Sequence, residues 1–312
     1  MGRVSGSMIT PEDLVGLLAP AGTPGGAAGV LRPVVLDVRW RLTGPPGRDD
    51  FEARRVPGAV FVDLDSELAA GPSVPGPGGR HPLPEPGALQ RVLRAAGIGE
   101  DDRPVVVHDD RDGSVAARAW WLLRWAGLDP ARVRVLDGGF AGWESAGGPV
   151  AGTAGGADEP EPLPPGDVVV RAGAMPVVDA DGAAALARDG VLLDARAAAR
   201  FRGETEPVDP RAGHVPGARN LPAAANTGPD GRWVGPDVLA DRFRAAGAAP
   251  GVPVGAYCGS GINACALVLA LEVAGLTTAD APAALYPGSW SEWSADPARP
   301  VATGDRPWAQ ER

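Results

Sequence analysis

The feature that most constrains the fold of this chain is an internal repeat. Residues 34–39 (Val-Val-Leu-Asp-Val-Arg) resemble residues 191–196 (Val-Leu-Leu-Asp-Ala-Arg), and both are apolar runs that end in Asp-x-Arg. Such a run predicts a buried strand that leads into a loop. Further segments correspond in the same order, namely 56–59 with 215–218, 104–108 with 253–257, and 137–143 with 287–293. The two copies stay roughly 150 to 160 residues apart, which indicates a duplicated domain.

Each copy alternates predicted strands with predicted helices. Apolar, Ala-rich stretches at 115–126 and 264–274 follow the strands at 104–108 and 253–257. Gly127 and Gly275 close these stretches, as glycine often closes a helix. The alternation predicts an α/β fold in which each domain is a mostly parallel sheet flanked by helices.

Composition places the domain boundary between the copies. We predict an N-terminal domain at 1–147, a linker at 148–167 that is rich in Gly, Pro and acidic residues, and a C-terminal domain at 168–312. A second Pro/Gly-rich stretch, at 71–86, lies inside the first copy and predicts a long surface loop.

Charge and hydropathy exclude two classes of partner. The chain has 312 residues and a net charge of -10, so nucleic acid is not expected as a partner, because phosphate binding needs a basic face. No apolar run reaches the ~20 residues that span a membrane, and residues 1–11 lack the pattern of a secretory signal. We expect a soluble, cytoplasmic protein without a membrane partner.

The chain has two cysteines, Cys258 and Cys265. On a helix they would lie about 10 Å apart, beyond the ~7 Å that a disulfide allows between Cα atoms. The three His residues and two Cys residues also lack the spacing of a zinc site. We predict neither a disulfide nor a metal site.

The two copies differ where the central strand meets the next helix. The second copy has Cys258-Gly-Ser-Gly-Ile-Asn there, and the first has Asp109-Asp-Arg-Asp-Gly-Ser. Backbone N–H groups of a tight loop and the positive end of the following helix favour an anion at this place. A cysteine there is therefore favoured as a thiolate nucleophile.

A lone cysteine is more often a buried, inert small hydrophobe. Such a residue needs no pair of glycines and no serine around it, so the sequence after Cys258 favours a catalytic role. For Cys265, which lies among Ala264, Ala266 and Leu267, core packing is the favoured interpretation.

The duplicated pattern, together with Cys258-Gly-Ser-Gly and residues 288–293 (Gly-Ser-Trp-Ser-Glu-Trp), resembles the tandem rhodanese family. That family includes thiosulfate and 3-mercaptopyruvate sulfurtransferases, and its N-terminal copy is catalytically silent. The cysteine sequence is similar to the mercaptopyruvate branch, whereas the thiosulfate branch has basic residues after the cysteine. Two departures are Ile262-Asn263 in place of Val-Thr, and Arg54-Arg55 in place of Gly-His.

The resemblance implies roles for residues in both copies. Arg200 matches one arginine that holds a substrate carboxylate, and Arg211 matches a second if two extra residues are allowed; surface ion pairing is the alternative for both. The substrate-binding set is completed by the loop residues Gly259, Gly261, Ile262 and Asn263. Arg196 is expected to brace the loops through an ion pair with a buried acid.

The resemblance also implies a Ser260-His81-Asp65 proton relay. The alternatives are a solvated loop residue for His81 and a helix N-cap for Asp65. Because His81 and Asp65 come from the first copy, the relay would draw on both copies.

The predicted reaction moves sulfur from 3-mercaptopyruvate to Cys258 as a persulfide, releases pyruvate, and passes the sulfur to a thiol such as thioredoxin, or to cyanide. No cofactor is required. Thiosulfate as donor and a non-enzymatic persulfide carrier remain alternatives. A cysteine phosphatase needs Cys-x5-Arg, and Ala264 stands at the arginine position.

Overall fold

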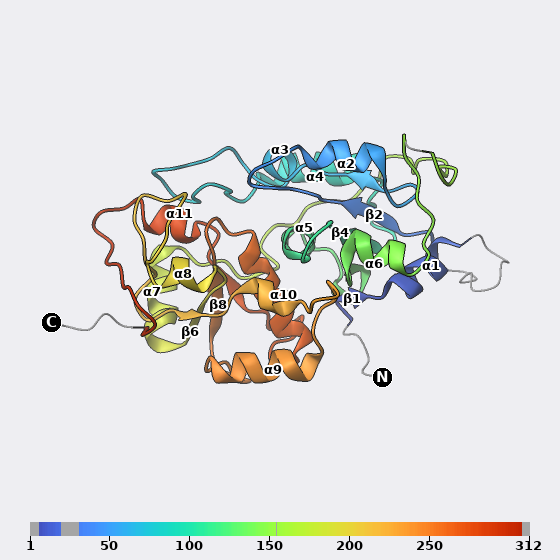
Figure 1. Ribbon diagram of the computed structural model, residues 1–312. Coiled ribbons are helices and arrows are strands. Elements are labelled where there is room, and N and C mark those ends of the chain that lie inside the picture. The colour runs from blue at the N-terminus through green and yellow to red at the C-terminus, as the bar shows by residue number, and fades with distance from the viewer. Residues whose placement is uncertain (1–5, 20–30, 154, 308–312) are drawn as a thin grey trace. The chain divides into compact units, whose positions relative to one another are not determined.

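The computed structural model describes residues 6–19, 31–153 and 155–307, and Figure 1 labels many of its helices and strands. The first five residues of the N-terminal stretch and residue 154 of the predicted linker lie outside this part. The described residues form two compact units. No helix in the described ranges combines the length and apolar character that a membrane span requires.

The first unit comprises Met1–Leu68, Pro84–Ala174 and Thr227–Trp233. Its strands are β1 (Met8–Ile9), β2 (Val34–Asp37), β3 (Val60–Phe61), β4 (Val105–His108) and β5 (Val133–Leu136). Its helices are α1 (Pro11–Leu18), α2 (Gly47–Ala53), α3 (Leu64–Glu67), α4 (Pro86–Ala95), α5 (Ser114–Trp125), the 3-10 helix η1 (Pro130–Arg132) and α6 (Gly139–Ser145).

The second unit comprises Ala69–Leu83, Met175–Asn226 and Val234–Arg312. Its strands are β6 (Val191–Asp194), β7 (Arg219–Asn220), β8 (Val254–Tyr257) and β9 (Ala284–Leu285). Its helices are α7 (Ala180–Asp189), α8 (Ala198–Phe201), the 3-10 helix η2 (Ala223–Asn226), α9 (Pro236–Ala245), α10 (Asn263–Val273) and α11 (Ser289–Trp293).

The two sheets share the order of four parallel strands. The first has the order β1-β5-β4-β2-β3, the second has β7-β6-β8-β9, and every strand pairing is parallel. The order of the last four strands of the first sheet, read backwards, is that of the second. An isolated parallel bridge between Val177 and Leu285 takes the place of the β1–β5 pairing. The predicted duplicated α/β fold is thus confirmed.

Two segments belong to a different structural unit from the residues on either side of them in the sequence. The predicted loop at 71–86 lies mostly within Ala69–Leu83, which belongs to the second unit. Conversely, Thr227–Trp233 belongs to the first unit. The first unit also runs to Ala174, beyond the predicted linker, because Arg171 and Gly173 donate hydrogen bonds to carbonyls at the end of α5.

A buried helix follows the central strand of each unit. All twelve residues of α5 are buried, and nine of the eleven residues of α10 are. Because both helices are enclosed by the protein interior, they fix the loops that precede them. Each ends before the predicted glycine, since Gly127 and Gly275 have φ values of 92° and 68°.

The Asp-x-Arg motif is used in the same way in both units. Arg196 folds back on the buried Asp194 at 2.7 Å and lies over the ring of Trp290 at 4.5 Å. Arg39 does the same with Asp37, at 2.9 Å, and with Phe140, at 4.3 Å. The predicted bracing role of Arg196 is confirmed. The motif ties the end of β2 to α6 in the first unit and the end of β6 to α11 in the second.

Candidate active site

Cys258 lies directly after β8, at the start of residues 258–262, which we call the cysteine loop. Its side chain is 3% exposed, and its Sγ accepts a hydrogen bond from the N–H of Gly261 at 3.1 Å. The N–H groups of Ser260 and Ile262 have no hydrogen-bond partner among the described residues. The loop therefore offers donors to an anion bound near the thiol.

Glycine is required at position 261. The residue has a φ of 81°, in the left-handed region, and a Cβ built there would lie 2.6 Å from the carbonyl oxygen of Pro287. Any side chain would therefore displace the turn that brings the Gly261 N–H to Cys258 Sγ.

Ser289, the first residue of α11, forms a hydrogen bond with the backbone of Cys258. Ser289 is fully buried and has a φ of 53°, the only positive φ of a non-glycine residue in the described ranges. Its Oγ accepts a hydrogen bond from the Cys258 N–H at 3.1 Å and donates one to the Tyr286 carbonyl at 2.9 Å. Trp290 N–H completes the anchor by donating to the Cys258 carbonyl at 3.0 Å. Ser289, which has a strained backbone conformation, is thus also a residue that contacts Cys258, the candidate nucleophile.

The corresponding stretch of the first unit, residues 109–113, is called the aspartate loop. The Asp109 carboxylate accepts hydrogen bonds from four backbone N–H groups, those of Arg111, Gly113, Val115 and Ala116, at 3.0 to 3.1 Å. Burial raises the pKa of Asp109, and the backbone donors act against that rise. The junction between strand and helix was predicted to favour an anion, and in the first unit the carboxylate of Asp109 takes that place.

Two guanidinium groups face the residue that follows Cys258. A Cβ built on Gly259 would lie 3.2 Å from Nη2 of Arg80 and 3.6 Å from Nη1 of Arg200. Both arginines contact Asp209, and Arg200 also binds Glu206, with 2.5 Å between Nη2 and Oε1. Arg200 therefore lies where an anion beside Cys258 could reach it, and it is ion-paired as well.

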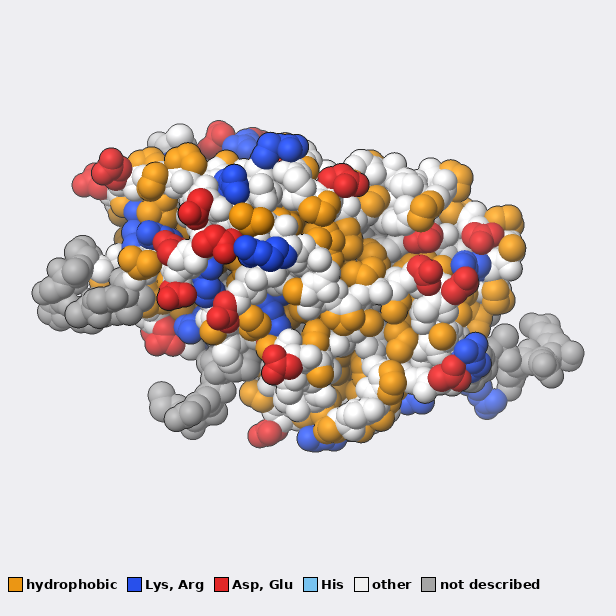
Figure 2. Space-filling model, turned by 180° about the vertical axis from the view of Figure 1, so that it is seen from behind, with side chains coloured by type: hydrophobic (Ala, Val, Ile, Leu, Met, Phe, Trp, Pro, Cys, Tyr) orange, Lys and Arg blue, Asp and Glu red, His pale blue; other side chains and the backbone are white. Residues whose placement is uncertain are grey.

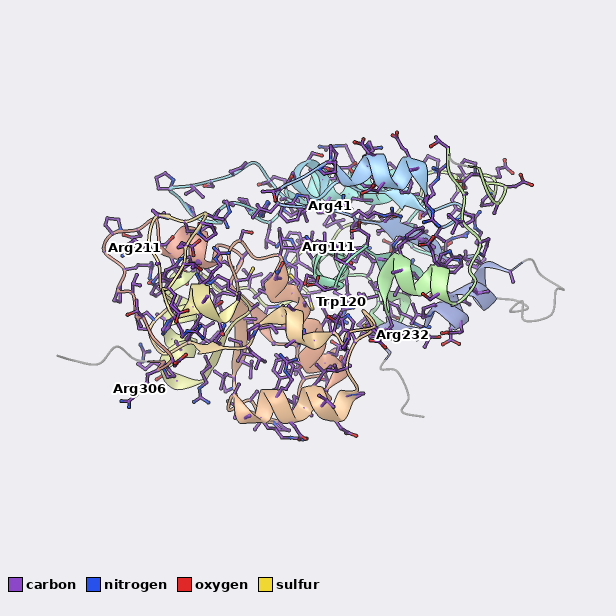
Figure 3. All side chains as sticks on the ribbon, viewed as in Figure 1. Arg41, Arg111, Trp120, Arg211, Arg232 and Arg306 are labelled. Carbon is purple, nitrogen blue, oxygen red and sulfur yellow. The ribbon has the colours of Figure 1, made fainter. Side chains whose placement is uncertain are left out.

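The expectation for Arg211 is not supported by its contacts. Its guanidinium donates to the backbone carbonyls of Ser294, Arg299, Trp293 and Asp296, at 2.5 to 2.9 Å. Figure 3 shows Arg211 beside α11. A guanidinium with four carbonyl acceptors has little left to offer a substrate. We correct the interpretation of Arg211 to that of a brace for residues 293–299.

The proposed relay residues are divided between the units. Ser260 and His81, both buried, belong to the second unit, whereas Asp65 belongs to the first. Asp65 accepts a hydrogen bond from Trp40 Nε1 at 2.8 Å. It is not the helix cap, because the N-cap of α3 is Asp63, whose side chain accepts from the Ser66 N–H.

The remaining predicted residues differ in their exposure. Ile262 is buried and precedes α10, while Asn263, the first residue of that helix, is exposed. Cys265 is fully buried and its Sγ donates to the Gly261 carbonyl at 3.3 Å. Both cysteines are free thiols, as the spacing predicts.

Sequence reasoning missed Arg80 and Ser289. The sequence signal for Arg80 was its position next to His81, within a Gly/Pro-rich segment that a surface loop also explains. For Ser289 the signal was its alignment with Gly139 of the first copy, where the φ is 55°.

Comparison with known proteins places the chain in a family. A family model described as "Rhodanese-like domain" matches residues 27–146 and again residues 179–296. The chain therefore belongs to the rhodanese-like family, as a tandem member and a sulfurtransferase.

Two curated relatives cover almost the whole chain. A probable 3-mercaptopyruvate sulfurtransferase of Pseudomonas aeruginosa is 46% identical over 278 residues, which are 87% of this chain and 93% of the relative. A putative thiosulfate sulfurtransferase, SseB, of Mycobacterium tuberculosis is 44% identical over 305 residues, 95% of this chain and 97% of the relative.

Solved structures agree with this assignment. The 3-mercaptopyruvate sulfurtransferase of Leishmania major matches with a TM-score of 0.74 and 26% identity, over 94% of this chain and 76% of the other. SseA of Escherichia coli matches with a TM-score of 0.67 and 29% identity, over 82% and 92%.

Proposed function

We propose that this sulfurtransferase takes sulfur from 3-mercaptopyruvate and carries it as a persulfide on Cys258. The observation that carries the proposal is the convergence, within one compact unit, of a buried thiol, backbone N–H donors and two guanidinium groups beside Gly259. A thiol in such a loop is suited to nucleophilic attack, and the guanidinium groups are suited to an anionic donor.

In the proposed first step the Cys258 thiolate attacks the sulfur of 3-mercaptopyruvate. An S–S bond forms, the C–S bond of the donor breaks, and its electron pair passes to carbon as the enolate of pyruvate. The proton of the donor thiol moves to that carbon, which leaves pyruvate and a Cys258 persulfide anion. The loop N–H groups, which include the one of Gly261 that already binds Sγ, stabilise the sulfur anion.

In the second step the outer sulfur leaves Cys258. Cyanide takes it as thiocyanate, or a thiol such as that of reduced thioredoxin takes it as a persulfide, and Cys258 is restored as a thiolate or thiol. Ser260 and His81 are proposed to pass the donor proton, and Asp65 to orient His81. A His81→Gln variant tests this relay, with a lower kcat and an altered pH profile as the expected result.

The charge balance beside the loop favours a donor with one negative charge. The positive charges of Arg80 and Arg200 are matched by Asp209 and Glu206, and Arg196 is matched by Asp194. A nearly neutral cluster holds a monoanionic carboxylate more readily than the dianion thiosulfate.

Thiosulfate remains the second candidate, for a specific reason. The cysteine loop has no basic residue of its own, but Arg80 and Arg200 supply guanidinium groups to it from elsewhere in the unit. One relative at 44% identity is also named a putative thiosulfate sulfurtransferase. The values of kcat/KM for the two donors decide between them.

Mass spectrometry after mixing the protein with 3-mercaptopyruvate tests the central proposal. We expect wild type and Cys265→Ala to gain the mass of one sulfur atom and to release pyruvate, and Cys258→Ala to gain none. A gain on Cys258→Ala would refute the assignment of the sulfur to Cys258. If only a partner protein loads Cys258, and neither small donor does, the protein is a persulfide carrier.

A further inference from the structure

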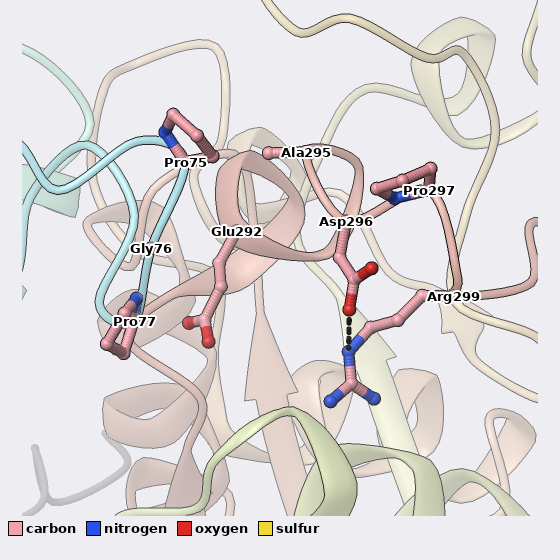
Figure 4. Close-up of a pocket in the computed structure, with 8 residues that line it drawn as sticks. All are labelled: Pro75, Gly76, Pro77, Glu292, Ala295, Asp296, Pro297 and Arg299. Carbon is pink, nitrogen blue, oxygen red and sulfur yellow. Dashed lines mark ion pairs between the residues drawn. The ribbon is translucent and has the colours of Figure 1, made fainter.

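A pocket of about 410 Å³ lies beside the end of α11, and no residue of the cysteine loop lines it (Figure 4). Its volume falls within the range of small-molecule sites, about 300 to 1,000 Å³. The pocket belongs to the second unit alone, since one wall comes from residues 75–77 and the rest from residues 292–299. The proline rings of Pro75, Pro77 and Pro297 supply most of its apolar lining.

The carboxylate of Glu292 lies in this pocket, between Pro77 and the ion pair of Asp296 with Arg299 (Figure 4). Its Oε2 accepts the Gly78 N–H at 3.1 Å, while its Oε1 accepts no hydrogen bond within the described ranges. The side chain is half-buried, and no arginine of the described residues forms an ion pair with it. A carboxylate that is partly removed from water and has no cation beside it favours a positively charged ligand.

The other charged groups of the pocket do not cancel the charge of Glu292. Arg299 is paired with two acids, because its Nη2 lies 2.9 Å from Asp181 Oδ1 and its Nε lies 3.6 Å from Asp296 Oδ2. Two carboxylates and one guanidinium line the pocket, which leaves one net negative charge. The lining therefore attracts a cation and repels an anion.

The hydroxyl of Tyr286 is a second polar group that lacks a partner close to Glu292. Tyr286 is fully buried, and its hydroxyl forms no hydrogen bond in the described part of the chain. Burial raises the pKa of Tyr286, and the negative charge of Glu292 adds to that rise, so the two groups lie within electrostatic reach of each other. Burial also raises the pKa of Glu292, and the Gly78 N–H acts against the rise. A cation beside Glu292 would stabilise the ionised carboxylate that burial penalises.

Both walls of the pocket are held in place by the fold. The Ser73 N–H donates to the Gly79 carbonyl at 2.9 Å, which closes the loop that carries two of the three prolines. On the other side, the four carbonyl contacts of Arg211 hold residues 293–299. A preformed pocket loses little conformational entropy when a ligand binds. The bracing role of Arg211 thus keeps one wall of the pocket in place.

We propose that this pocket binds an alkylammonium or alkylguanidinium ion, with the cationic head on Glu292 and the apolar stem against the proline rings. A metal ion is a poorer match, because no group of three or more His, Cys, Asp or Glu side chains in the described residues could hold one. The matching chemistry is that of a small organic amine, or of a lysine or arginine side chain on another protein. The proposal does not rest on the proposed function, and its test involves no sulfur transfer, so the two can fail separately.

An NMR titration of the full chain at constant ionic strength tests the proposal. The probes are n-butylamine, n-butylguanidine, n-butanol and butyrate, which have similar stems and differ in the charge of the head. We expect the two cations to shift the amide resonance of Gly78 with a Kd of about 1 mM, and the other two probes to bind at least about 10-fold more weakly. Equal affinities for the four probes, or no saturable shift with either cation, would overturn the proposal.

Three variants locate the binding. Glu292→Gln keeps the shape of the side chain but removes its charge, and it should weaken the binding of n-butylamine at least about 10-fold. Glu204→Gln is the matched control and should leave the Kd unchanged, because Glu204 lies outside the pocket and pairs with Arg202. Ala295→Leu narrows the pocket without a change of charge and should also weaken binding. An unchanged Kd in Glu292→Gln contradicts the proposal, and if that variant does not fold, an unchanged Kd in Ala295→Leu does so.

A capped lysine distinguishes the two sources of the cation. Nα-acetyl-lysine methylamide carries the side chain as a protein presents it. If it binds as tightly as n-butylamine, the pocket is suited to a basic side chain of a partner protein. If it binds at least about 10-fold more weakly, the pocket is suited to a small free amine. Either result supports an organic-cation site, whereas failure of every cation to bind overturns it.

Discussion

The aspartate loop and the cysteine loop are two versions of one structure. Each follows the central strand of its sheet and precedes a buried helix. Four N–H groups of the aspartate loop and of α5 converge on the Asp109 carboxylate, whereas in the cysteine loop one N–H reaches Sγ, and those of Ser260 and Ile262 have no acceptor in the described part of the chain. The same backbone arrangement can therefore bind a carboxylate of the chain itself, as it does with Asp109. It can also keep N–H donors available for a reacting group, as in the cysteine loop.

The supports beneath the two loops differ by one side chain. Gly139, with φ 55°, and Ser289, with φ 53°, occupy corresponding positions at the start of α6 and α11. In both units the next residue donates its N–H to the loop carbonyl, Phe140 to Asp109 and Trp290 to Cys258. Only the serine adds a hydroxyl that receives the Cys258 N–H. The strained serine therefore lies under the loop that carries the candidate nucleophile.

A segment from elsewhere in the sequence lies against each loop. A Cβ on Gly113 of the aspartate loop would lie 2.9 Å from Trp233 Nε1, and the Trp233 N–H donates to Asp137. In the cysteine loop the residue that a distant segment approaches is Gly259, where a Cβ would lie 3.2 Å from Arg80 Nη2. The indole of Trp233 lies against the aspartate loop, whereas the guanidinium of Arg80 offers N–H donors to an anion beside the cysteine loop.

Acidic and basic side chains are interspersed on the face drawn in Figure 2. Near Cys258 the charges of Arg80 and Arg200 are likewise paired with acidic side chains, those of Asp209 and Glu206.

The largest expected effect separates the two loops by activity. Cys258→Ala should lower sulfur transfer at least 10³-fold, because the nucleophile is lost. Asp109→Asn should change kcat/KM less than threefold, since the aspartate loop supplies no group to the proposed reaction. Pyruvate release with 3-mercaptopyruvate and cyanide measures both, and a comparable loss in Asp109→Asn would break the comparison.

The second effect concerns stability, and here the substitution of Asp109 should have a larger effect than that of Cys258. Asp109→Ala leaves four N–H groups without their acceptor and should lower the free energy of unfolding by about 3 kcal/mol. Cys258→Ala removes a small side chain with one such bond and should cost about 1 kcal/mol. Urea unfolding, followed separately for each transition, measures the two values. Equal costs would mean that the aspartate loop is not held by its carboxylate.

The third prediction concerns the support of the cysteine loop. Ser289→Gly reproduces the first copy, relieves the left-handed strain and removes the acceptor for the Cys258 N–H. The two effects on stability oppose each other, so the free energy of unfolding should change by less than about 1 kcal/mol. The kcat should fall about 10-fold, because Cys258 is less well positioned. Gly139→Ala is the reciprocal control, expected to destabilise the first unit without affecting kcat.

The smallest effect is a pH dependence confined to the aspartate loop. Because burial raises the pKa of Asp109, the folded state binds its proton more tightly than the unfolded state does. This contribution to stability is complete below the unfolded pKa of about 3.9 and is lost as pH rises through the higher folded pKa. We expect the stability of the first unit to decline as pH rises through this range, and the decline to be absent in Asp109→Asn; urea midpoints at each pH measure it.

Much of the fold was predictable from local pattern. Apolar runs that end in Asp-x-Arg marked β2 and β6, and Ala-rich stretches closed by Gly127 and Gly275 marked α5 and α10. These signals are reliable because burial and backbone conformation act on neighbouring residues. The same reasoning located Cys258 at the end of a strand and assigned Cys265 to the core.

The sequence by itself determined the duplication, the parallel α/β sheets and the loop that holds the candidate nucleophile. Only the tertiary structure decided which arginines face that loop. Arg211 and Arg80 look equally available in the sequence, but the guanidinium of the first donates to four backbone carbonyls, whereas that of the second lies beside Gly259. The physical reason is that the hydrogen-bond partners of a guanidinium determine whether it can bind a further group. Those partners come from residues far away in the chain.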